Sequence, residues 1–247
     1  MKITYPNKIA WRRPIAEGEE DFFTGKKQTR LRKLLDNLNL YGISHRFVEP
    51  DEVFFERFLP EYEKMIGTKD NALSIDVRNY QIRDGDNFAK RMALEIYDKD
   101  KVIGATIFFD CRLSANVAFK AYSNKWLTPG PQIGPSLYSE FLMYQWAKEH
   151  NKKFISLGLD RNPYGPNSSI GLATYKLSAG YNPVQPKNCE LLEMDTETIS
   201  TDTLVFRQND NNSNQIKKAT LLASKQDDYE LLLSQSKDIL EIDIIKL

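Results

Sequence analysis

Residues 135–160, PSLYSEFLMYQWAKEHNKKFISLGLD, combine a helix and a strand in one continuous stretch. Pro135 suits the first turn of a helix, where its missing N–H needs no acceptor, and the helix runs to about His150. The apolar run FISLGL at 154–159 then predicts a strand. A helix that joins two strands allows them to run parallel. The stretch therefore predicts a crossover within a sheet.

Three β-rich runs precede that helix. They are MALEIYD at 92–98, KVIGATIFFDC at 101–111 and ANVAFKAYSN at 115–124. Only the short polar turns DKDK and RLS separate them, and turns this short join antiparallel neighbours. The runs predict an antiparallel meander whose last strand is followed by the crossover.

Two helices and a strand are predicted before the meander. TGKKQTRLRKLLDNLNLYG at 24–42 predicts a helix with a basic first half, and the alternating run ISHRFVE predicts a strand after it. Asp51 is a suitable cap for a second helix that ends at Gly67. Pro60 lies inside this helix and is expected to kink or divide it.

A further helix follows the crossover strand. It is predicted from Ile170 to Ala179, because Gly180 can adopt the left-handed conformation that closes a helix and Pro183 prevents its resumption. From residue 188 onward, apolar runs predict strands and one short helix. The expected organisation is an N-terminal helical and strand segment (1–67), a central core (68–187) and a C-terminal β-rich extension (188–247), packed as one unit.

Composition excludes several classes of protein. Lys and Arg (34) balance Asp and Glu (34), so no global field attracts the chain to DNA or to an anionic membrane. No apolar run approaches the roughly 20 residues of a membrane span, and the N-terminal sequence does not match a signal peptide. We therefore expect a cytoplasmic protein. The two cysteines and two histidines have no ligand spacing, so no metal site is expected.

Four motifs, in order, resemble those of a known fold. KKQTRLRKLL, PSLYSEFLMYQWAKEHNKKF, ISLGLD and TYKLSAG follow one another between about residues 25 and 185. The arrangement resembles the GNAT fold of N-acyltransferases, in the branch related to the FemAB peptidoglycan aminoacyl ligases. The resemblance implies an α/β protein with a mixed, mostly antiparallel central sheet and flanking helices. It also implies a splay between the strands at 117–122 and 154–159.

The resemblance implies an enzyme that transfers an acyl group to an amine. The donor would be an acyl thioester, either acyl-CoA or an acyl carrier protein, and the acceptor an amine of a small molecule or sugar. An aminoacyl-tRNA-dependent ligase on the same fold is the alternative, and a basic patch at Lys26–Lys33 would suit tRNA phosphates. A non-catalytic binding module that kept the fold is a third interpretation.

The donor's phosphates are expected at the start of the helix that begins near Pro135. Backbone N–H groups and the helix dipole favour an anion there. The candidate donor-binding residues are Gln132, Gly134, Pro135, Ser136, Leu137, Asn167 and Lys176. The stretch GPQIGPS at 130–136 also fits an ordinary tight loop with a proline in the first helical turn.

The reaction needs an acid for the leaving group and a base for the amine. By resemblance, Tyr175 would protonate the departing thiolate. Asp160 and Glu140 are the candidate bases, although either carboxylate could be a cap or a surface group. Three further residues are candidates for bordering the acceptor: Lys120, Tyr122 and Arg161. Lys120 and Tyr122 are two residues apart on a predicted strand, so they are expected to face the same side of the sheet.

Tyr175 and Lys176 are adjacent on their helix and point about 100° apart, so both cannot be core. We expect Tyr175 to face the cleft between the splayed strands and Lys176 to lie at its rim. The other interpretation makes Tyr175 a packed aromatic and Lys176 a solvated surface lysine.

Overall fold

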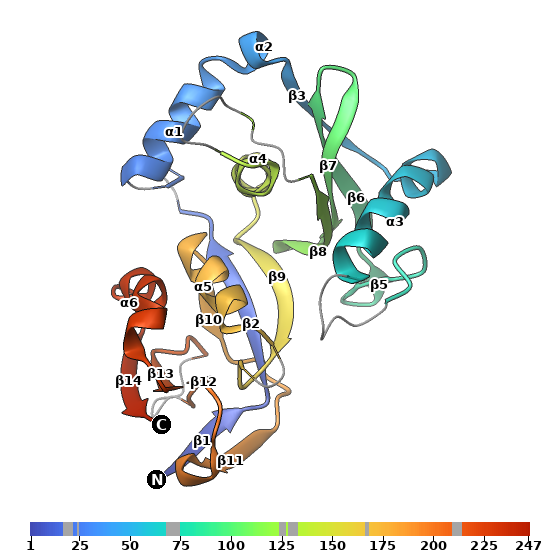
Figure 1. Ribbon diagram of the computed structural model, residues 1–247. Coiled ribbons are helices and arrows are strands. Elements are labelled where there is room, and N and C mark those ends of the chain that lie inside the picture. Colours follow the sequence, from blue (N-terminus) through green and yellow to red (C-terminus); the bar gives the residue numbers. More distant parts are fainter. Residues whose placement is uncertain are drawn as a thin grey trace. The chain divides into compact units, whose positions relative to one another are not determined.

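The computed structural model of the 247-residue chain is shown as a ribbon in Figure 1. The described residues are 1–16, 22–23, 25–67, 75–123, 127, 133–165, 168–208 and 214–247. The chain forms two compact units, here called the terminal unit (Met1–Arg13 and Leu157–Leu247) and the central unit (Pro14–Ser156). The division at residues 67 and 187 that the sequence suggested stays a prediction.

The central unit is built on a mixed sheet. Four antiparallel strands follow one another in the order β8 (Ser114–Tyr122), β7 (Lys101–Asp110), β6 (Lys90–Asp98) and β3 (Ile43–Val48). β8 also pairs in parallel with the first residues of β9 (Phe154–Arg161). The predicted meander and crossover are therefore confirmed. The parallel ladder ends at Asn116 and Ser156, as expected for strands that part.

Two helices cover opposite faces of this sheet, α3 (Glu52–Gly67) and α4 (Pro135–Glu149), as Figure 1 shows. Successive side chains of a strand point to opposite faces. Phe119 of β8 accordingly contacts Tyr62 of α3, with ring centroids 5.6 Å apart. Tyr122, three residues further along at the end of β8, directs its hydroxyl group to Ser139 of α4. Each face therefore has its own set of side chains from the same strand.

α3 begins at the cap that the sequence predicts, and it continues through Pro60 to Gly67. Asp51 Oδ1 accepts a hydrogen bond of 2.8 Å from the Phe54 N–H, which confirms the cap. The expectation that Pro60 divides the helix is wrong, because α3 is one helix of 16 residues with Pro60 inside it. Phe58 and Tyr62 on either side of Pro60 are buried, and their packing offsets the hydrogen bond that proline removes.

The helix predicted at 24–42 is interrupted. It forms α1 (Gly25–Leu35) and α2 (Leu38–Tyr41). Asn37 lies at the break, where its Nδ2 donates to the Lys33 carbonyl at 2.8 Å, and such local bonds compete with helix continuation. The remaining elements of the central unit are two short strands, β4 (Arg83–Asp84) and β5 (Asn87–Phe88).

The terminal unit combines both ends of the chain. Its strands include β2 (Lys8–Pro14), which lies between β10 (Asn182–Val184) and β9. Trp11 of β2 is fully buried against Phe206, with ring centroids 5.5 Å apart. The sequence did not predict the strands at residues 2–14.

The rest of the terminal unit matches the strands and short helix predicted after residue 188. β1 pairs with β11, and β12, β13 and β14 form a separate sheet. The remaining elements are β1 (Lys2–Pro6), α5 (Ile170–Ser178), β11 (Leu191–Asp195), η1 (Thr196–Thr198), β12 (Thr203–Phe206), β13 (Lys218–Ala223), η2 (Gln226–Tyr229), α6 (Glu230–Ser236) and β14 (Glu241–Lys246). In the described part of the chain, no helix has the length and apolarity needed to cross a bilayer.

Candidate functional site

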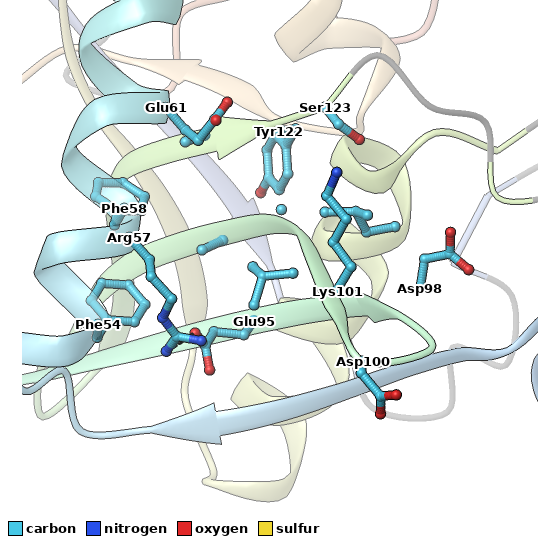
Figure 2. Close-up of a pocket in the computed structure, with 15 residues that line it drawn as sticks. Phe54, Arg57, Phe58, Glu61, Glu95, Asp98, Asp100, Lys101, Tyr122 and Ser123 are labelled. Atoms are coloured by element: carbon cyan, nitrogen blue, oxygen red, sulfur yellow. Dashed lines mark hydrogen bonds and ion pairs between the residues drawn. The ribbon is translucent and has the colours of Figure 1, made fainter.

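The central unit contains a pocket of about 640 Å³ beside α3 (Figure 2). Its walls come from α3, from the hairpin between β6 and β7, and from the end of β8. The lining residues with aromatic or ionisable side chains are Phe54, Arg57, Phe58, Glu61, Glu95, Asp98, Asp100, Lys101 and Tyr122. The volume falls in the range of small-molecule sites.

One wall of the pocket is aromatic. Phe54 and Phe58 are stacked on the same side of α3, with ring centroids 5.4 Å apart and planes 16° from parallel. Gly104 on β7 has no side chain, and a Cβ there would collide with the Tyr122 ring. The glycine therefore allows the Tyr122 ring to lie directly against the neighbouring strand.

A buried carboxylate lies in the wall of the pocket. Glu95 is 1% exposed and accepts from Arg46 Nε at 2.6 Å, Arg57 Nη2 at 3.0 Å and the Tyr97 hydroxyl at 2.6 Å. Figure 2 shows Arg57 reaching from α3 toward it. The hydrogen bond to Glu95 raises the pKa of Arg46. A buried charge needs such partners, so the cluster ties α3 to β3 and β6.

Sequence reasoning missed this cluster and the pocket. A signal was present, because Glu95 is the one ionisable residue in the middle of the apolar run MALEIY. A charge at a core position of a strand is either paired or part of a site. The partners Arg46 and Arg57 lie 49 and 38 residues away, so spacing alone could not identify them.

Tyr122 joins a cluster of buried hydroxyl groups on the α4 face of the sheet. Its hydroxyl donates to Ser139 Oγ at 2.7 Å and lies in close contact with Thr106 Oγ1. Thr106 Oγ1 and Ser139 Oγ are 2.9 Å apart. Burial raises the pKa of the Tyr122 phenol, so the group stays protonated at neutral pH and can donate a hydrogen bond.

Lys120 lies on the same face of β8 as Tyr122, as the alternation predicted. Its Nζ forms an ion pair with Glu140 Oε1 on α4. The side chain of Glu140 is 1% exposed and that of Lys120 is 19% exposed. The structure therefore brings together three of the predicted residues, Lys120, Tyr122 and Glu140, between one strand and one helix.

The start of α4 has the predicted geometry. Pro135 is the first helical residue after an extended Gly134, with Ser136 and Leu137 in the first turn. Their binding of a phosphate stays a prediction, and Gln132 lies outside the described residues. In the described part of the chain, no group of His, Cys, Asp and Glu is arranged to hold a metal ion.

Lys176 and Asp160 form a second ion pair, in the terminal unit. Lys176 Nζ and the Tyr164 hydroxyl both donate to Asp160 Oδ2 at 2.6 Å. Trp11 Nε1 donates to the Tyr164 hydroxyl at 2.8 Å, and the Lys176 ammonium lies 5.6 Å from the Trp11 ring centroid. Burial, and then Asp160, raise the pKa of Tyr164 well above its ordinary value.

The expected positions of Tyr175 and Lys176 are partly wrong. Lys176 is 5% exposed and does not lie at a rim, because the carboxylate of Asp160 and the ring of Trp11 draw it into the core of the unit. Tyr175 is half-buried. Its role as an acid stays a prediction.

α5 ends before Gly180 for two reasons, the left-handed conformation of this glycine and the close approach of Arg13 to it. Gly180 has a φ of +82°, and a Cβ there would lie 2.9 Å from Arg13 Nη1. Arg13 is buried and donates to the Ala179 carbonyl at 2.6 Å, which satisfies a carbonyl at the helix end. Of the other predicted residues, Arg161 is exposed and Asn167 lies outside the described residues, and their roles stay predictions.

Comparison with known proteins supports the fold. No protein-family model and no curated protein matches the sequence. Among solved structures, FemX has a TM-score of 0.51 at 12% identity, covering 72% of this chain and 59% of FemX. The chain has the mixed α/β architecture of a GNAT-like fold, with a mostly antiparallel sheet and flanking helices.

Two further structures match with lower scores. L-PGS from Bacillus licheniformis has a TM-score of 0.44 at 14% identity, covering 72% of this chain and 54% of that one. The C-terminal domain (DUF2156) of a putative lysylphosphatidylglycerol synthetase from Agrobacterium fabrum has a TM-score of 0.46 at 12% identity, covering 79% and 63%. The chain thus spans less than two thirds of the length of each of these solved chains.

Proposed function

We propose that the protein is a transferase that moves an acyl group from an activated donor to the amine of a small molecule or sugar. The observation that carries this proposal is the GNAT-like fold shared with FemX. The polar groups of the central unit fit the chemistry, because a buried tyrosine hydroxyl and a lysine–carboxylate pair lie between β8 and the start of α4.

In the proposed reaction the amine nitrogen forms a bond to the acyl carbon. The bond from that carbon to the sulfur or oxygen of the donor breaks. A carboxylate takes the amine proton, and the leaving group receives a proton. In the central unit, Glu140 is the candidate base, and Lys120 and Tyr122 would orient the acceptor. In the terminal unit, Asp160 is the candidate base and Tyr175 the candidate acid.

Two donors are consistent with this chemistry. An acyl thioester, on CoA or on a carrier protein, is the donor that the GNAT-like motifs imply, with its phosphates at the start of α4. The resemblance of the sequence motifs to those of the FemAB-related ligases favours the second donor, an aminoacyl-tRNA. Both donors belong to the cytoplasm, which is the compartment that the proposal requires.

Native mass spectrometry of freshly purified protein, followed by transfer assays, tests the proposal. A copurified CoA thioester, or acylation of an amine by labelled acyl-CoA, would support the thioester donor. Copurified tRNA, or transfer from aminoacyl-tRNA, would support the aminoacyl ligase. If neither donor binds or reacts, the protein is a binding module and the proposed activity is wrong.

A further inference from the structure

Two opposite charges flank Tyr122 in the pocket of the central unit. Figure 2 shows Lys101 extending from β7 toward Tyr122 and Ser123, and Glu61 on α3 at the other side of Tyr122. Both side chains are exposed. Within the described part of the chain, neither forms a hydrogen bond or an ion pair.

The other charged pair of the pocket is already occupied. Arg57 contacts Glu95, and Arg46 also contacts Glu95, so this carboxylate is neutralised from two sides. Of the other charged side chains in the lining, Figure 2 shows Glu61 and Lys101 beside Tyr122, whereas Asp100 points away from it. A ligand bound beside Tyr122 would therefore meet Glu61 and Lys101. Phe54 and Phe58 form an apolar wall of the pocket on α3, the helix that also carries Arg57 and Glu61.

We propose that this pocket binds a free α-amino acid with an apolar side chain. Its ammonium would pair with Glu61, its carboxylate with Lys101, and its side chain would pack on Phe54 and Phe58. A ligand with one charge would leave one of the two groups unpaired. A polyphosphate fits poorly, because Glu61, Asp98 and Asp100 place negative charge around the same space.

The identification of this amino acid as the acceptor of the acyl group rests on the proposed function. The binding itself does not, since it depends only on the pocket. Isothermal titration of the full chain with L-leucine tests the binding directly. Leucine methyl ester, which lacks the anion, and N-acetylleucine, which lacks the cation, are the matched ligands.

We expect leucine to bind up to about 5-fold more tightly than either analogue, since exposed ion pairs contribute up to about 1 kcal/mol. Lys101→Gln should abolish the preference for leucine over its methyl ester. Glu61→Gln should abolish the preference over N-acetylleucine. Glu63→Gln and Lys64→Gln are matched controls, because both residues are exposed on α3 and do not line the pocket.

Absence of saturable leucine binding would overturn the proposal, as would analogues that bind as tightly as leucine. Unchanged preferences in the Lys101 and Glu61 variants would overturn it as well. An acylation assay separates this inference from the proposed function. Acylation of a simple amine without leucine binding would refute only the amino-acid site, whereas leucine binding without acyl transfer from either donor would refute only the enzyme.

Discussion

Each compact unit contains a lysine–carboxylate ion pair formed by two of the predicted site residues, and these two pairs differ in their surroundings. In the central unit, Glu140 is 1% exposed and Lys120 is 19% exposed, so the carboxylate is deep and the ammonium is near solvent. In the terminal unit, the side chains of Lys176 and Asp160 are 7% and 12% exposed. Tyr164 and Trp11 enclose that pair.

The difference in exposure and surroundings separates a pair that stabilises the fold from a pair that is accessible to a ligand. Asp160 accepts a hydrogen bond from Tyr164, and Lys176 lies over the ring of Trp11. Buried polar groups with such partners form a structural network. The Lys120–Glu140 pair adjoins the hydroxyl group of Tyr122, which lines a pocket, and its ammonium can reach solvent. Functional chemistry is therefore easier to assign to the central pair.

The largest expected effect follows from the deep position of Glu140. Lys120→Met removes the cation that faces a buried carboxylate, and breaking a buried pair costs about 3 kcal/mol. The free energy of unfolding, measured in denaturant, should fall by that amount. The double variant Lys120→Met/Glu140→Leu should recover most of it. A fall of less than about 1 kcal/mol would place this pair with ordinary surface ion pairs.

The second prediction concerns Tyr175, the half-buried neighbour of Lys176. Tyr175→Phe removes only a hydroxyl group, so stability should hardly change. If Tyr175 protonates the leaving group, turnover should fall on the order of 10²-fold. Tyr41→Phe, at another half-buried tyrosine, is the control. Full turnover in Tyr175→Phe would show that this tyrosine only packs.

A smaller loss of stability is expected from the terminal pair. Lys176→Met leaves Asp160 with the Tyr164 hydroxyl as a donor and with more exposure than Glu140 has. The free energy of unfolding should fall by about 2 kcal/mol, less than for Lys120→Met. Thermal and denaturant unfolding of Lys176→Met and Lys120→Met, measured at the same pH and salt concentration, compares the two losses. A larger loss of stability in Lys176→Met than in Lys120→Met would contradict the view that the more deeply buried carboxylate, Glu140, is the costlier one to leave unpaired.

The smallest effect is expected at Tyr122. Tyr122→Phe removes one partner from the cluster with Thr106 and Ser139, which should cost about 1 kcal/mol at neutral pH. Because the pKa of Tyr122 is raised in the folded protein, its contribution is complete below the ordinary tyrosine pKa of about 10. The contribution is lost as the pH rises through the folded pKa.

The free energy of unfolding, measured at a series of alkaline pH values, tests whether ionisation of Tyr122 causes this loss of stability. Stability should decline less steeply above about pH 10 in Tyr122→Phe than in the wild type. Identical slopes would show that the titration of Tyr122 is not linked to folding.

Much of the fold could be predicted because its signals are local. The turns DKDK and RLS are too short for anything but antiparallel neighbours, and β6, β7 and β8 confirm this. Pro135 marked the start of α4. The alternation along β8 also placed Lys120 and Tyr122 on one face. The strands at residues 2–14 were missed because their partners, β10 and β11, lie about 170 or more residues away.

The sequence by itself determined the order of strands and helices in the central unit, since hydrophobic period, turn length and helix ends act over a few residues. It also determined that Lys120 and Tyr122 would face the same side of the sheet. Only the tertiary structure decided which lysine is buried, which arginines neutralise Glu95 and where the pocket opens. These outcomes depend on side chains distant in sequence, because a buried charge is stable only where folding brings a partner to it.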